Sequence, residues 1–203
     1  MAILNLIKRL PIDLGQGHYR HETKAKTVAF ALAGDGNGKK ALDFGCGDGF
    51  WSEQLKSRGW DVTSVDNYDF RYKYTQQVDA EQKLSFPDNT FELVWVLEVV
   101  EHVKHVEQLL DEFRRITKPG GRIIITTPNS NFWLYRILRP FGITPPKIQN
   151  PDHKQFFSFA DMQRLFPQAY IYGFFPYTLI KLVISSGIGF LSPTFIVIED
   201  QSA

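Results

Sequence analysis

The chain lacks the features that would place it outside a reducing compartment or inside a membrane. Its 203 residues include one cysteine, Cys46, so no disulfide can form within the chain and a cytoplasmic location is expected. The longest apolar stretch, Ile171 to Phe195, is interrupted by glycines, prolines and a lysine, which argues against a membrane-spanning helix. Lys8 and Arg9 follow the short N-terminal apolar run, whereas a signal peptide has its basic residues first.

An excess of charge of either sign is also missing. The 23 basic and 22 acidic residues leave a net charge of +1, and no basic stripe is visible, so nucleic acid is not an expected partner. Neither an internal repeat nor a low-complexity segment is visible. The length and the 43% hydrophobic fraction are typical of one globular domain over residues 1–203.

Strand and helix patterns alternate after a leader of 38 residues, in which helices are possible at Leu4–Leu10 and His21–Ala33. Strands are predicted at Lys40–Phe44, Asp61–Val65, Gln77–Ala80, Phe91–Leu97, Arg122–Thr127, Tyr170–Phe175 and Thr194–Glu199. Helices are predicted at Phe50–Arg58, at Val106–Thr117 and after a capping box of Ser158 and Asp161. This order predicts an α/β three-layer sandwich with a mostly parallel seven-stranded sheet and a C-terminal antiparallel hairpin.

A glycine-rich turn follows the first predicted strand, in the run Ala41–Gly49 (ALDFGCGDG). Glycines there let the backbone turn tightly and approach a ligand, and the helix that follows points free N–H groups at it. The spacing is G-x-G-x-G, and Phe50 stands where a dinucleotide fingerprint has its third glycine. This spacing disfavours a nicotinamide or flavin enzyme.

Acidic residues end the next two predicted strands. Asp66 ends the second strand, where a carboxylate can accept hydrogen bonds from both hydroxyls of a ribose. Asp79 lies at the end of the third predicted strand, where a carboxylate can accept a hydrogen bond from the amino group of an adenine. The glycine turn and the two acids together favour an adenosine-containing ligand.

Four stretches resemble the class I S-adenosylmethionine-dependent methyltransferases, over Asp43 to about Phe166. They are ALDFGCGDG, VTSVDN, VDAEQKLSFPDNTFELVWVLEVVEHV and FRRITKPGGRIIITTPN. Within that superfamily the chain is similar to the ubiquinone-type O-methyltransferase and methyltransferase type 11 groups. The resemblance implies a Rossmann-like sandwich, S-adenosylmethionine as cofactor and a methyltransferase activity.

The resemblance also implies which residues bind the cofactor. Asp66 would hold the ribose hydroxyls, and Asp79 with Ala80 would lie at the adenine. The remaining expected cofactor residues, nearer the methionine and ribose, are Asp43, Gly45, Cys46, Gly47, Gly49, Asn67 and Leu97. Two features depart from the family pattern: Asp48 replaces a small hydroxylated residue, and the short Asp66–Asp79 connection leaves little room for the usual helix.

A cluster of possible metal ligands follows the fourth predicted strand. If the chain is helical there, Glu98, Glu101 and His102 share one face because they are spaced i, i+3 and i+4. With His153 as a fourth ligand, such a set suits Mg²⁺, Mn²⁺ or Zn²⁺. The E-x-x-E-H run resembles one in ubiquinone-type O-methyltransferases, and one that binds metal in small-RNA 3′-end 2′-O-methyltransferases. Alternatively, Glu98 only lines the pocket and His153 only anchors a loop.

His102 and His153 are also the best candidates for a general base, because histidine titrates near neutral pH. The leading hypothesis is methyl transfer from S-adenosylmethionine to an oxygen of a small or medium-sized acceptor. The alternatives are a metal-dependent RNA 2′-O-methyltransferase and a non-catalytic S-adenosylmethionine-binding protein. The oligomeric state stays open.

Residues 128–157 are rich in proline and are predicted to form an acceptor-side loop or lid. Within them, the aromatic and basic run Phe132–Arg139 suits a lid, an ordinary packed helix or a peripheral membrane contact. An apolar helix is possible at Leu179–Ile184. In the leader, Tyr19 or Arg20 would be able to reach the carboxylate of the cofactor.

Overall fold

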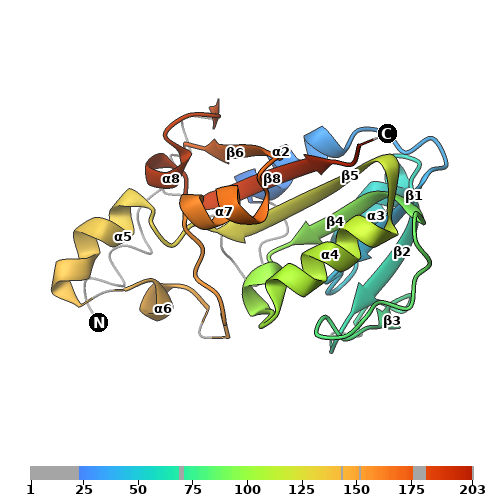
Figure 1. The fold of residues 1–203 in the computed structure, drawn as a ribbon, viewed down its shortest axis with the longest axis horizontal. Helices are drawn as coiled ribbons and strands as arrows, with labels where there is room; N and C mark the ends of the chain where they lie inside the picture. The colour runs from blue at the N-terminus through green and yellow to red at the C-terminus, as the bar shows by residue number, and fades with distance from the viewer. Residues whose placement is uncertain (1–22, 69–70, 143, 151, 176–181, 203) are drawn as a thin grey trace.

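A twisted sheet with helices on both faces makes up most of the structure, a computed structural model (Figure 1). It describes residues 23–68, 71–142, 144–150, 152–175 and 182–202. The strands are β1 (Lys40–Phe44), β2 (Asp61–Asp66), β3 (Gln76–Gln77), β4 (Phe91–Leu97), β5 (Thr117–Pro128), β6 (Tyr170–Phe174), β7 (Val183–Ile184) and β8 (Thr194–Asp200). The helices are α2 (Lys24–Ala33), α3 (Phe50–Ser57), η1 (Val100–His102), α4 (Val106–Ile116), α5 (Trp133–Leu138), η2 (Arg139–Phe141), α6 (Pro145–Ile148), α7 (Phe159–Leu165) and α8 (Ile188–Leu191).

The strand order in the sheet is β3-β2-β1-β4-β5-β8-β6-β7. The strands from β3 to β5 pair in parallel, and β8 lies antiparallel between β5 and β6. The predicted fold class is therefore confirmed, including the antiparallel C-terminal strands. Within the described residues the sheet has eight strands where seven were predicted, because the short β7 adds to the edge beside β6.

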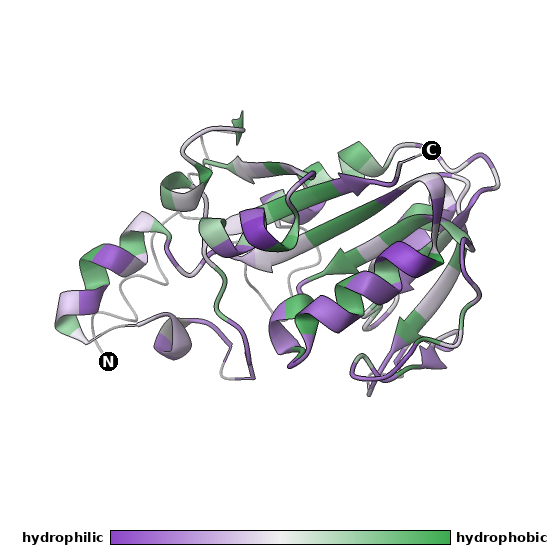
Figure 2. Ribbon diagram, in the orientation of Figure 1, coloured by the Kyte–Doolittle hydropathy of each residue, from purple (hydrophilic) through white to green (hydrophobic). Residues whose placement is uncertain are grey.

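Alternating side chains divide the interior of the described residues into two main clusters, one on each face of the sheet. In β1, Leu42 and Phe44 face the cluster under α4 and α7, and Ala41 faces the cluster under α2 and α3. In β4, Val94 and Trp95 divide in the same way. This period of two is what a strand buried on both sides requires. Figure 2 shows the apolar strands between helices whose outer faces are polar.

Helix α4 begins and ends close to its prediction, and its apolar positions are buried. Leu109, Leu110 and Phe113 are among the residues that it packs on the sheet. On the other side, the Arg114 guanidinium lies 2.7 Å from a carboxylate oxygen of Glu199, and so connects α4 to β8. The end of α4 at Ile116 leads directly into β5, which is longer than predicted because it includes the Pro-Gly-Gly turn.

The capping box predicted for α7 is present. The Ser158 hydroxyl accepts from the Asp161 N–H at 3.3 Å, and the Asp161 carboxylate accepts from the Ser158 N–H at 2.8 Å. Two N–H groups that a helix start leaves unpaired are thereby satisfied.

The third predicted strand was wrong in its extent. β3 is two residues long, and Asp79 and Ala80 lie in the turn that follows it, outside the sheet. The described part of the β2–β3 connection contains no helix, as its short length predicted. Because β3 pairs only with Val65 and Asp66 of β2, the sheet does not hold the chain extended as far as Asp79.

Several predictions about the irregular segments need correction. Residues 128–157 are not one loop, because α5, η2 and α6 lie within them. Val183–Ile184 is a strand where a helix was expected at Leu179–Ile184, and residues 179–181 lie outside the described residues. The predicted helix Leu4–Leu10 also lies outside them, whereas α2 supports the second leader helix. No helix in the described ranges is long and apolar enough to cross a bilayer.

Candidate functional site

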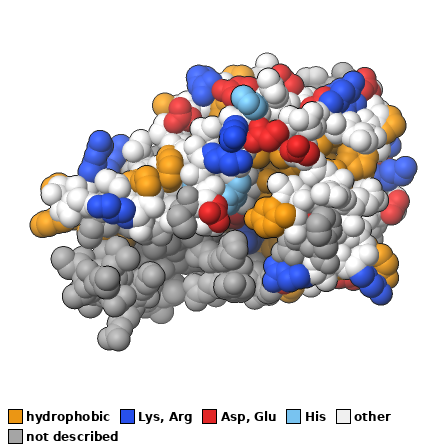
Figure 3. Space-filling view, turned by 90° about the horizontal axis from the view of Figure 1, so that it is seen from below, with side chains coloured by type: hydrophobic (Ala, Val, Ile, Leu, Met, Phe, Trp, Pro, Cys, Tyr) orange, Lys and Arg blue, Asp and Glu red, His pale blue; other side chains and the backbone are white. Residues whose placement is uncertain are grey.

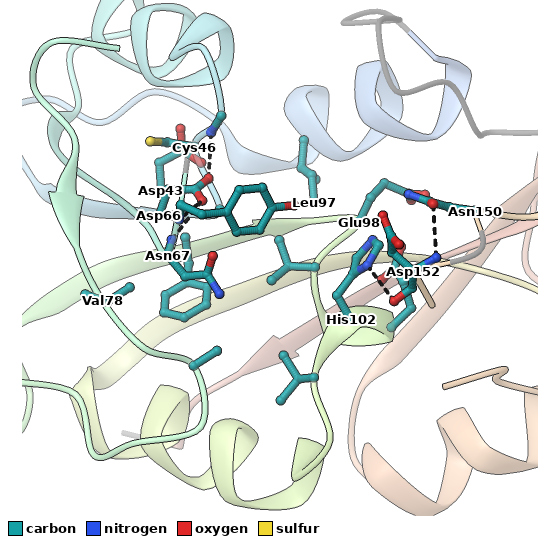
Figure 4. A pocket seen from close by; sticks show the side chains of 18 of the residues that line it. Asp43, Cys46, Asp66, Asn67, Val78, Leu97, Glu98, His102, Asn150 and Asp152 are labelled. Atoms are coloured by element: carbon teal, nitrogen blue, oxygen red, sulfur yellow. Dashed lines mark hydrogen bonds between the residues drawn. The ribbon is translucent and has the colours of Figure 1, made fainter. Parts of the chain in front are cut away.

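A cavity of about 640 Å³ opens at the carboxyl edge of the parallel strands. β1 pairs in parallel with both β2 and β4, so the chain leaves all three strands at the same edge of the sheet. Ligands of open α/β sheets bind at this edge, where the strand order reverses. Every predicted site residue lines the cavity except Gly49. Figure 4 shows two groups of side chains, one around Asp66 and one around His102.

Two glycines of the turn are required for steric reasons. Gly45 has a φ of +80°, and a Cβ there would lie 2.3 Å from the Val99 side chain. Gly49 has a φ of +82°, and a Cβ there would lie 2.3 Å from the ring of Tyr72. L-residues with a side chain rarely adopt such φ values. Gly49 is not among the residues that line the cavity, because the ring of Tyr72 packs on it, and its role in cofactor binding stays a prediction.

The Asp66 carboxylate links the end of β2 to the glycine turn. One oxygen accepts from the Gly47 N–H at 3.0 Å, and the other accepts from the Asn67 N–H at 2.7 Å. These bonds hold the half-buried carboxylate at the wall of the cavity. Asp79 and Ala80 line the same end of the cavity from the turn after β3, although Asp79 is exposed.

Asp43 lies beneath the turn and is buried. The Ser52 hydroxyl of α3 donates to its carboxylate at 2.6 Å, and Ser52 also contacts Ser64 of β2 at 2.7 Å. Burial raises the pKa of Asp43 to about 7; the Ser52 bond lowers it in part and the charge of Asp66 raises it. The carboxyl group thus ties α3 to β1 below the glycine turn.

At the other end of the cavity, Glu101, His102 and His153 lie together. Nε2 of His153 is 4.0 Å from Oε1 of Glu101, and the two imidazole rings are 4.7 Å apart and nearly perpendicular. The N–H groups of Lys154 and Gln155 donate to the Glu101 carbonyl, which brings the His153 loop against η1. One possible ligand atom from each of the three residues lies within 4.8 Å of the others.

Glu98 does not join this group, so the predicted shared helical face was wrong. Its φ is +57°, a left-handed conformation that separates β4 from η1. The short helix therefore begins only at Val100, after Glu98. The Glu98 carboxylate accepts from the Thr126 hydroxyl at 3.0 Å, yet it still lines the cavity. A non-glycine residue held at positive φ beside a cavity is a common feature of functional sites.

The Glu101 carboxylate is buried and only half satisfied. Oε2 accepts from the Thr127 hydroxyl at 3.1 Å, whereas Oε1 has no hydrogen-bond partner among the described residues. Burial raises the pKa of Glu101 well above its usual value, and the charge of Glu98 adds to the effect. A buried carboxylate oxygen without a partner is costly, so this oxygen suits an external donor or cation.

His153 is neutral at pH 7, because burial and the neighbouring His102 lower its pKa to about 4. Its Nδ1 lies 3.3 Å from Oε1 of Gln149. If Nδ1–H donates to this oxygen, the lone pair of Nε2 faces Glu101. Nε2 of Gln149 is buried and, within the described residues, has no hydrogen-bond partner.

Sequence reasoning missed Gln149 and Lys26. Gln149 lies four residues before His153 in the sequence, and both line the cavity. This short spacing could have suggested that Gln149 contacts that histidine. Lys26 comes from α2, where the small buried residues Ala25 and Ala29 let the helix lie close to the sheet. Its positive charge lowers the pKa of Glu101, against the larger effect of burial. Tyr19 and Arg20, the candidates in the leader, lie outside the described residues.

Comparison with known proteins gives one family. The profile of the methyltransferase domain matches residues 17–176. The ubiquinone biosynthesis O-methyltransferase of Aeromonas salmonicida is 29% identical over 63% of this chain and 60% of its own length. That of Pseudomonas aeruginosa (strain UCBPP-PA14) is 33% identical over 46% of each chain. The chain thus spans about half the length of the curated relatives it matches.

Two solved structures agree with the fold. A SAM-dependent methyltransferase from Archaeoglobus fulgidus has a TM-score of 0.66 at 21% identity, over 88% of this chain and 92% of its own. A possible histamine N-methyltransferase from Thermotoga maritima has a TM-score of 0.68 at 18% identity, over 88% of each chain. At these identities the likeness shows the fold alone.

Asp43 gives the first testable expectation, which concerns stability and pH. Its pKa is about 7 in the folded chain and 3.8 for an unperturbed aspartic acid, so the folded state binds the proton more tightly. Stability is therefore greatest below pH 3.8 with respect to this group and falls as the pH rises to about 7. At 1.36 kcal/mol per pH unit, the fall amounts to about 4 kcal/mol.

Asp43→Asn should remove this contribution, so that its free energy of unfolding declines less steeply than that of the wild type over the same pH range. Urea unfolding of the two ligand-free proteins at successive pH values measures the difference. Glu101, whose pKa is also raised, contributes equally to both proteins and cancels in the comparison. If the free energies of unfolding of the two proteins changed in parallel with pH, the pKa of Asp43 would not be raised on folding.

Proposed function

The chain belongs to the class I S-adenosylmethionine-dependent methyltransferases, and we propose that it transfers the methyl group to an oxygen atom of a small or medium-sized acceptor. The observation behind this proposal is that one cavity joins the Asp66 end to the Glu101–His102–His153 end. Its volume of about 640 Å³ is typical of small-molecule and cofactor sites.

The cofactor end fits the parts of S-adenosylmethionine. The Asp66 carboxylate, held by the glycine turn, faces the cavity as an acceptor for the ribose hydroxyls, and Asp79 with Ala80 provides an edge for adenine. We propose that Lys26, which lines the same cavity, binds the methionine carboxylate, because its positive charge complements that group. Cys46, Asn67 and Leu97 line the space between.

S-adenosylmethionine, when bound, supplies a methyl group activated by a sulfonium leaving group. The protein then has to align the acceptor oxygen with that methyl group and keep it there. We propose that the acceptor occupies the end of the cavity formed by Glu101, His102 and His153. The neutral imidazole of His153 can accept a proton, but with a pKa of about 4 it is a weak base. An acceptor hydroxyl with a lowered pKa therefore suits this site best.

A divalent cation is the natural means of lowering that pKa, and the residues fit one. Glu101 presents a buried oxygen without a partner within the described part of the chain, and His153 presents Nε2 4.0 Å away. His102 completes the group, and Gln149 orients His153 as outer partners of ligating histidines do. Two imidazoles with one carboxylate favour Mn²⁺ over Mg²⁺, because Mg²⁺ prefers oxygen ligands. Such a cation would lower the pKa of a bound hydroxyl.

The choice of oxygen also has support from the relatives. The matching proteins from Aeromonas salmonicida and Pseudomonas aeruginosa are named as O-methyltransferases of ubiquinone biosynthesis. Because this chain spans about half their length, only the acceptor atom is carried over into the proposal, and not their substrate.

The contributions of Asp66 and Lys26 to cofactor affinity can be separated by comparing two ligands, S-adenosylhomocysteine and adenosine. Asp66→Ala should weaken both S-adenosylhomocysteine and adenosine about a hundredfold, because two charge-assisted hydrogen bonds to the ribose are lost. Lys26→Ala should weaken S-adenosylhomocysteine about tenfold and leave adenosine unchanged, because adenosine has no carboxylate. Calorimetric titration measures all four affinities. Asp61→Ala, at the exposed start of β2, serves as the control. Equal losses for both ligands in Lys26→Ala would contradict the assignment of Lys26.

The acceptor atom can be tested with S-adenosylmethionine labelled in its methyl group. We expect the label on an oxygen of catechol, which offers two neighbouring hydroxyls, and no label on 1,2-diaminobenzene of the same shape. Mass spectrometry and NMR of the product locate the methyl group, and Asp66→Ala reports any contaminating activity. Transfer to the diamine alone would exclude the oxygen assignment. Transfer to the 3′-terminal ribose of a short RNA would replace the small acceptor with the RNA alternative.

The proposed cation site can be tested by measuring Mn²⁺ binding directly, without measuring methyl transfer. Wild-type protein should bind one Mn²⁺, seen as loss of the electron paramagnetic resonance signal of the free ion. Glu101→Gln and His153→Ala should weaken it at least a hundredfold, and Gln149→Leu about tenfold. His105→Ala, an exposed histidine three residues from His102, should bind as the wild type does. Titration with S-adenosylhomocysteine shows that each variant is folded. Unchanged Mn²⁺ affinity in Glu101→Gln would refute the site.

A further inference from the structure

An exposed apolar surface lies at the end of the molecule formed by α5, η2 and α8. Phe141 is 71% exposed, Ile137 56% and Phe190 50%. The Arg136 guanidinium lies 5.7 Å from the centre of the Phe190 ring, which places α5 and α8 side by side. Single exposed apolar side chains are ordinary, but several together mark an interaction surface. We call Arg136, Ile137, Arg139, Phe141 and Phe190 the basic-apolar surface.

Among the described residues, the charge at this end is of one sign. The sequence has 22 acidic residues, yet none of them lies in residues 129–151 or 162–198. Arg136, Arg139 and Lys147 are all exposed there. At the left-hand end of the view in Figure 3, the coloured side chains of the described residues are accordingly hydrophobic and basic. A chain with a net charge of +1 is thus locally positive at this end.

The exposed side chains are held by a small cluster of their own. Phe132, Leu134, Tyr135 and Leu138 form a buried cluster that is separate from the two clusters on the sheet. Leu134, Tyr135 and Leu138 occupy the inner side of α5, so Ile137 lies on its outer side, and Phe141 follows in η2. The outward apolar groups therefore stand on an ordered support, between arginines whose long stems can pack along apolar surface.

We propose that the basic-apolar surface docks on the surface of a membrane that contains anionic lipid. Apolar groups flanked by arginine are what interfacial binding requires, because the apolar groups enter the headgroup boundary while the cations meet lipid phosphate. Nucleic acid fits less well, because Ile137 and Phe141 would face a charged backbone. A protein partner is an outcome of the test.

The position of this surface adds a consequence that rests on the proposed function. α6 follows η2 closely, and five residues shortly after α6 line the cavity: Gln149, Asn150, Asp152, His153 and Lys154. An acceptor dissolved in or lying at the membrane would therefore meet the acceptor end of the cavity close to the docking surface. The docking itself does not depend on methyl transfer and is tested without it.

Sedimentation with vesicles provides the test. The full chain should bind vesicles of equimolar phosphatidylcholine and phosphatidylglycerol, bind phosphatidylcholine alone weakly, and be released by salt. Arg136→Gln with Arg139→Gln should lower the partition coefficient about thirtyfold, since each basic residue near an anionic surface contributes about 1 kcal/mol. Ile137→Ser with Phe141→Ser should lower it at least tenfold.

Matched controls lie away from this surface. Lys39→Gln with Lys83→Gln removes two exposed charges elsewhere, and Tyr170→Ser removes a side chain that is 63% exposed on β6. Both should bind vesicles as the wild type does, and S-adenosylhomocysteine binding shows that every variant is folded. The proposal is overturned if the wild type does not bind the anionic vesicles, or if variants and controls lose binding equally. It is also overturned if light scattering finds a dimer that Phe141→Ser dissociates, because a second copy then occupies the surface.

Discussion

The parallel pairing of β1 with both β2 and β4 is the constraint on which the cavity depends. It brings Asp66 and Leu97 to the same edge, on either side of the glycine turn. The register is enforced by the core, since Leu42 and Phe44 of β1 face one cluster and Ala41 the other. A slip of one residue would turn Leu42 and Phe44 to the wrong face, so packing in the core positions the two ends of the cavity.

The two buried carboxyl groups that line this cavity, Asp43 and Glu101, differ in whether their oxygens have hydrogen-bond partners. Asp43 receives a hydrogen bond from Ser52, so its carboxylate has a partner in the ligand-free chain. Glu101 receives one from Thr127, but Oε1 has none among the described residues. Burying charge is costly in both cases. The buried Asp43 carboxyl connects β1 to α3 through Ser52 and so stabilises the fold. The buried Oε1 of Glu101 makes no such connection within the described residues. A ligand or cation that binds Oε1 of Glu101 would offset the free-energy cost of burying it. We therefore assign Glu101 to binding or catalysis, and Asp43 to structural support.

Local sequence patterns predicted the framework and part of the site. Phe91–Leu97 was predicted to the residue because a continuous apolar run between turn signals leaves few alternatives. Asp66 was placed correctly because it ends a strand whose pairing is fixed by the core. The two-residue β3 was overestimated because the pattern at Gln77–Ala80 reports local preference and not the length of the neighbouring strand. Glu98 was misplaced because its spacing to Glu101 assumes a helix, and a positive φ has no signature in a glutamate. Lys26 lies far from the cavity in sequence, so only the packing of α2 reveals it.

The reduced β2–β3 connection changes how the cofactor end is built. Where a helix would cover it, Tyr72 instead packs its ring on Gly49, and its hydroxyl contacts Glu53 and Lys56 of α3. The glycine turn is thus supported from outside by one aromatic side chain. Asp79 is exposed as a consequence, and Tyr68, which is 75% exposed, lines the cavity from the same connection. An adenine bound at such an open edge would gain little from burial. The affinity for the cofactor must then come mainly from charged groups, for which we propose the Asp66 carboxylate at the ribose and Lys26 at the methionine.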